Sequence, residues 1–71
     1  MPTAHEWIDA YAERIGAPAP TPEERDAILA LAGVAAHASE RIAAPIACWM
    51  AGRAGLSLEE AMRAARALAE H

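Results

Sequence analysis

The segment between residues 37 and 45 contains the side chains that are most able to take part in binding or catalysis. His37, Glu40 and Arg41 place an imidazole, a carboxylate and a guanidinium within five residues. On a single helix these three would share a face, because positions i, i+3 and i+4 are neighbours. An almost wholly apolar segment follows from Pro45. A guanidinium and an imidazole beside the start of a helix are groups that bind a phosphate or a carboxylate.

Three interpretations of this cluster remain open. In the structural one, Glu40 folds over to cap the first free N–H groups of the helix that contains Pro45, and Arg41 pairs with Glu40. In the functional one, His37, Arg41 and the helix start hold an anionic ligand. In the third, one helix runs through the whole segment and is kinked at Pro45. We favour Glu40 and Pro45 as the structural cap and keep His37 and Arg41 as the candidate ligand-binding residues.

Other reactive groups are sparse. Cys48 is the single cysteine, so the chain has no internal disulfide. Together with His37 it would supply two ligands, whereas a zinc site needs three or four. His5 and Glu6 begin like the helical zinc motif of metalloproteases, but Asp9 stands where the second histidine would be. We therefore expect no metal, no cofactor and no catalytic residue, and the sequence favours a protein that is not an enzyme.

The positions of the helices follow from three capping boxes. Each pairs a hydroxyl with a glutamate three residues later, and they are Thr3–Glu6, Thr21–Glu24 and Ser57–Glu60. With the apolar periodicity between them, they predict helices over about residues 4–15, 22–39, 44–54 and 58–70. Gly33 inside the second helix is unfavourable and suggests a close helix crossing.

The third predicted helix is apolar nearly all round, with Arg53 as its one charged residue. A helix without a polar face belongs inside a structure. Trp7 and Trp49 are expected to anchor the core. The fold that we predict is all-α: a single compact four-helix domain over residues 1–71 with a buried third helix.

Composition excludes several classes of partner. The net charge is −4, and the six cationic residues are arginines scattered along the chain, so we expect no nucleic-acid binding. No apolar run approaches the roughly 18 residues that a membrane span needs, and no signal peptide is visible, so we expect a cytoplasmic protein. Alanine supplies 21 of the 71 residues. Such a thin core favours homo-oligomers as a source of stability, and a homodimerising scaffold that uses spare apolar surface is an alternative function.

The chain also resembles a family of small alanine-rich helical domains of unknown function from high-GC Gram-positive bacteria. The resemblance rests on four stretches: Trp7-Ile8-Asp9, Ala36-His37 through Glu40-Arg41, Ala43-Ala44-Pro45 and Ala51-Gly52-Arg53-Ala54-Gly55. Ile42 departs from the pattern, in which proline is expected. Such domains resemble a segment fused to molybdenum-cofactor guanylyltransferases. The resemblance implies a non-catalytic accessory or protein-interaction role near molybdopterin-guanine dinucleotide biosynthesis, with a molybdenum-cofactor nucleotidyltransferase as partner.

Overall fold

The computed structural model describes residues 2–70, and this part of the chain consists of four helices without strands. They are α1 (Ala4–Ile15), α2 (Pro22–Ala38), α3 (Ala43–Arg53) and α4 (Leu58–Ala69). The predicted all-α four-helix fold is confirmed, and each predicted helix boundary is correct to within one residue. The chain leaves helical geometry between α2 and α3, so the continuous kinked helix is excluded.

Local hydrogen bonds explain why three of the helices begin where they do. All three predicted capping boxes form. In the second, Thr21 Oγ1 accepts from the Glu24 N–H at 3.1 Å, while Glu24 Oε1 accepts from the Thr21 N–H at 2.7 Å. Each box satisfies two N–H groups that the helix itself leaves free, and a cap of this kind contributes about 1 kcal/mol.

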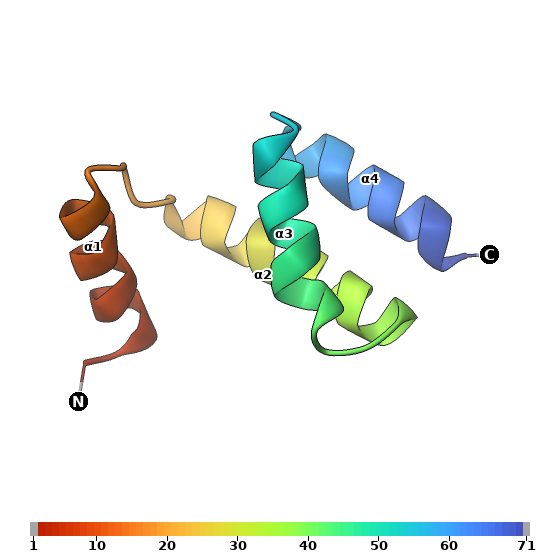
Figure 1. Ribbon diagram of the computed structural model, residues 1–71, viewed down its shortest axis with the longest axis horizontal. Coiled ribbons are helices and arrows are strands. Elements are labelled where there is room, and N and C mark those ends of the chain that lie inside the picture. The colour runs from red at the N-terminus through yellow and green to blue at the C-terminus, as the bar shows by residue number, and fades with distance from the viewer. Residues whose placement is uncertain (1, 71) are drawn as a thin grey trace.

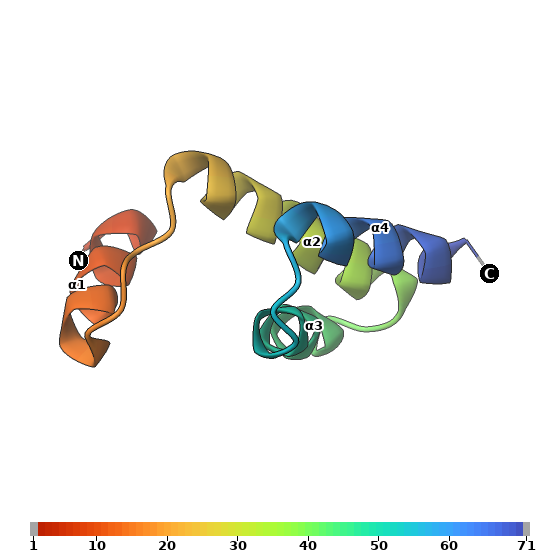
Figure 2. The same ribbon diagram turned by 90° about the horizontal axis from the view of Figure 1, so that it is seen from above.

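Helix α2 is the centre of the fold. Helices α3 and α4 both pack on it, whereas α1 lies to one side and meets only its N-terminal end (Figure 1). Turning the molecule shows the same arrangement, with α3 and α4 on different sides of α2 (Figure 2). Among residues 2–70, the buried residues are Leu31 of α2, Ala61 of α4 and Ala12 of α1. Leu31 is the one large side chain among them, so the core is small and is organised around α2.

The predicted burial of the third helix is not confirmed, because no residue of α3 is buried. Its half-buried side toward α2 carries small residues such as Ala47, Cys48 and Ala51. Two of its large side chains lie on the other side, where Trp49 remains 67% exposed and Ile46 59% exposed, whereas Met50 borders the space among α2, α3 and α4. Small residues allow α3 to approach α2 closely, but within residues 2–70 no further element covers its outer side.

One further feature departs from the sequence-based prediction. Gly33 is not a crossing point, because a Cβ atom added to it would meet nothing within 4 Å. The Cα radius of gyration is 12.9 Å, against about 11 Å for a typical folded domain of this length, because α1 projects from the other three helices. No helix in residues 2–70 has the length and apolar character to cross a membrane.

Candidate functional site

The structure separates the cluster that the sequence singled out. His37 lies in the last turn of α2, whereas Glu40 and Arg41 lie in the connection to α3. All three are exposed, and no hydrogen bond or ion pair joins their side chains to any other residue of the described chain. They therefore do not share one helix face. The anion-binding role of His37 and Arg41 stays a prediction, which amide NMR shifts on titration with phosphate would test.

The start of α3 is satisfied by backbone atoms. Ile42 occupies the N-cap position, and no side chain caps the helix. The carbonyl oxygen of Glu40 accepts from the Ala43 N–H at 2.9 Å, and that of Arg41 accepts from the Ala44 N–H at 3.1 Å. Pro45 follows in the first turn, where its missing N–H leaves no unsatisfied donor. Glu40 thus contributes its carbonyl to the helix start, and its carboxylate forms neither the expected cap nor a pair with Arg41.

A different polar cluster, which sequence reasoning missed, joins α1 to α2. Arg25 donates from Nη2 to Asp9 Oδ1 at 2.6 Å and from Nη1 to His5 Nδ1 at 2.8 Å. Its Nε donates to the Pro20 carbonyl oxygen at 2.9 Å. The Arg25 side chain is only 13% exposed, whereas that of Asp9 is 63% exposed. This cluster, the Arg25 clamp, fixes α1 and the linker against the start of α2. The i, i+4 spacing of His5 and Asp9 was its one visible signal.

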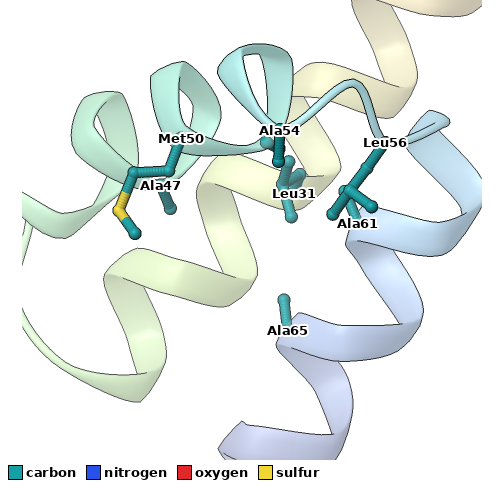
Figure 3. A pocket seen from close by; sticks show the side chains of 8 residues that line it. Leu31, Ala47, Met50, Ala54, Leu56, Ala61 and Ala65 are labelled. Carbon is teal, nitrogen blue, oxygen red and sulfur yellow. The ribbon is translucent and has the colours of Figure 1, made fainter.

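Two of the hollows that border the central helix have mainly apolar linings. One, of about 290 Å³, lies between α1 and α2 and includes Ile8, Ile28 and Leu29 in its lining. The other, of about 270 Å³, lies among α2, α3 and α4 (Figure 3). The second is lined by Leu31, Met50, Leu56 and five alanines. Because the second hollow has no polar side chain to orient a reacting group, it suits an apolar side chain better than a substrate.

The largest side chains of α1 form an exposed row. Trp7, Tyr11 and Ile15 follow each other at i, i+4 and i+8, and each is at least half exposed. We refer to these three residues as the α1 stripe. The rings of Trp7 and Tyr11 stack with centroids 5.1 Å apart and planes 12° from parallel. On a helical projection, this stripe lies about a quarter turn from the side that meets α2.

A second exposed row, the α3 stripe, consists of Ile42, Ile46 and Trp49 and is 59–73% exposed. It runs along the side of α3 opposite to α2, because Ala47 and Ala51 occupy the packed side. The prediction that Trp7 and Trp49 anchor the core is therefore wrong. Apolar periodicity located both rows, but it could not show that this chain leaves them uncovered.

Cys48 behaves as a structural thiol at the contact between α3 and α2. Its Sγ donates to the Ile28 carbonyl oxygen at 3.9 Å. Burial raises the pKa of the half-buried Cys48 thiol, which favours its protonated form. Within residues 2–70, no group of three or more histidine, cysteine, aspartate or glutamate side chains is arranged to hold a metal ion.

Comparison with known proteins places the chain in a family without assigning it an activity. Residues 1–71 match the family described as "Domain of unknown function (DUF6457)". Since the match spans the whole sequence, the chain belongs to this family. No curated protein and no solved structure matches it.

Proposed function

We propose that this member of the DUF6457 family is a non-catalytic protein-interaction domain that binds a protein partner through its α1 stripe. The observation that carries the proposal is the stacked Trp7–Tyr11 pair, which lies exposed on a helix that projects from the other three. Tryptophan and tyrosine are enriched among the residues that dominate protein–protein binding energy. Contiguous exposed apolar side chains of this size are typical of interaction surfaces.

The construction of α1 supports the same proposal. The Arg25 clamp uses His5 and Asp9, which lie on one side of α1, and so leaves the Trp7–Tyr11 side free. The aromatic pair is thus held in place without being covered. Because the two rings already stack against each other, little side-chain freedom remains to be lost on binding, which favours affinity.

The partner that we propose is a molybdenum-cofactor nucleotidyltransferase, and the support for it is the sequence resemblance alone. In this role the domain would assist molybdopterin-guanine dinucleotide biosynthesis without performing the transfer. The test is to titrate the chain into a purified cofactor guanylyltransferase and to follow both binding and turnover. If the chain neither binds nor alters turnover, this choice of partner is wrong.

The use of the α1 stripe has a test of its own that requires no known partner. A photo-cross-linking amino acid in place of Tyr11 should give, in cells, a cross-linked product of defined mass. The matched control places it at Glu13, which is also exposed but lies on the opposite face of α1. Trp7→Ala should abolish the product formed at position 11. Equal cross-linking from positions 11 and 13, or none from either, would contradict binding through the stripe.

A further inference from the structure

The α3 stripe has the spacing of a helix-pairing seam. Ile42, Ile46, Trp49 and Arg53 follow each other at i, i+4, i+7 and i+11, which keeps them in one row along the helix. The row lies opposite to the small residues that pack on α2, so the remainder of the described chain leaves it open. The fold thus packs one side of α3 on α2 and leaves the apolar row on its other side exposed.

The chain exposes more accessible surface than a folded monomer of the same mass is expected to expose. The accessible surface is 5790 Å² for a chain of 7.5 kDa. A folded monomer of this mass exposes about 4,250 Å², so the excess is about 1,500 Å². A standard protein–protein interface covers about 800 Å² on each partner, and obligate homodimers cover more. This excess belongs to the whole chain, the projecting helix α1 included, and it is larger than one side of a standard interface, so the chain has more uncovered surface than the α1 stripe alone would need.

We propose that a second copy of this chain covers the α3 stripe, and that two copies pair through α3 around a two-fold axis near Trp49. The size of the core favours a second copy as the occupant. Among the described residues only Leu31 and two alanines are buried. A chain with so small a core gains stability when a partner covers the α3 stripe. A second copy of the chain is always available as this partner, because it is made wherever the chain is made.

The charges on α3 specify how the two copies are oriented. Helix α3 has no acidic residue, and Arg53 is its one charged side chain. Two chains with a net charge of −4 can therefore meet across an uncharged surface. A parallel pair would place the two Arg53 side chains beside each other. An antiparallel pair places them at opposite ends of the seam, and a two-fold axis perpendicular to the helices produces this arrangement.

Sedimentation equilibrium of the full chain at micromolar concentration tests the proposal. The expected mass is twice 7.5 kDa. Trp49→Ala should weaken the dimer about 30- to 1,000-fold, as expected for an aromatic residue at the centre of an interface. The matched control is Leu68→Ala, which truncates a side chain that is 74% exposed on α4 and should leave the dimer intact. A monomeric wild type, or equal effects of the two substitutions, would overturn the proposal.

Two further measurements cover the case in which separated chains unfold. The melting temperature of the wild-type dimer should rise with protein concentration, whereas that of a monomer would stay constant. Spin labels on Arg53→Cys in a Cys48→Ala background should lie about 16 Å or more apart in the antiparallel dimer, and side by side if the pairing is parallel. The cross-link from position 11 is independent of all these results, so failure of the dimer and failure of the proposed partner binding are distinguishable.

Discussion

Replacement of Arg25 by alanine should loosen α1 selectively. The substitution removes an ion pair to Asp9 at 2.6 Å and hydrogen bonds to His5 and to the Pro20 carbonyl. Fully exposed ion pairs contribute about 0.2–1 kcal/mol, and hydrogen bonds to charged groups contribute about 1.5–3 kcal/mol. Because Arg25 is largely covered and Asp9 is mostly exposed, we expect a loss near 1.5 kcal/mol, which corresponds to about tenfold in the docking equilibrium.

Amide hydrogen exchange resolves this effect by segment. An isolated helix of 12 residues is marginal in water, so the protection of α1 reports its docking on α2. Exchange in α1 should accelerate about tenfold in Arg25→Ala, while the amides around Leu31 change little. Arg25→Lys keeps the charge but lacks the planar fork of donors, and should fall between alanine and wild type. Unchanged exchange in α1, or equal acceleration in α1 and around Leu31, would refute the role of the clamp.

Three further predictions concern stability. Leu31→Ala should lower the free energy of unfolding by about 2–5 kcal/mol, because Leu31 is 3% exposed at the centre of the core; a loss below about 1 kcal/mol in urea titrations would show that the core lies elsewhere. Gly33→Ala should raise the free energy of unfolding by about 0.5–1 kcal/mol, because the added Cβ atom has no neighbour within 4 Å. A decrease in the free energy of unfolding would instead support the close helix crossing that the sequence suggested. Capping hydrogen bonds lower the pKa of Glu6 and Glu60 in the folded chain, so stability should be constant above the ordinary carboxyl value of 4.5 and fall as the pH drops below it. The double variant with glutamine at both positions should lose part of this acid sensitivity, and an unchanged pH profile would argue against the two caps.

The helix boundaries could be predicted because the interactions that fix them are local. Each capping box closes between residues three apart, so the hydrogen bonds that the side chains of Thr3, Thr21 and Ser57 accept can be predicted from the sequence. The Arg25 clamp could not be predicted in the same way. Asp9 and Arg25 are 16 residues apart, and only the path of the linker brings them together. The same limit applies to Glu40, because its expected cap depended on how the chain turns between α2 and α3.

The position of α3 shows a second physical limit of sequence patterns. When a helix is apolar on every side, contact of any side with water is unfavourable. The sequence pattern does not identify the element or molecule that covers each side. Here α2 covers the small residues around Ala47, and α4 also packs on α2. The clamp holds α1 at the far end of α2, out of reach of the α3 stripe. Within residues 2–70 the four helices make other contacts, so none of them covers Trp49, which stays 67% exposed. The hydrophobic pattern of α3 would fit burial in an assembly, although burial of this helix is not confirmed in the single chain.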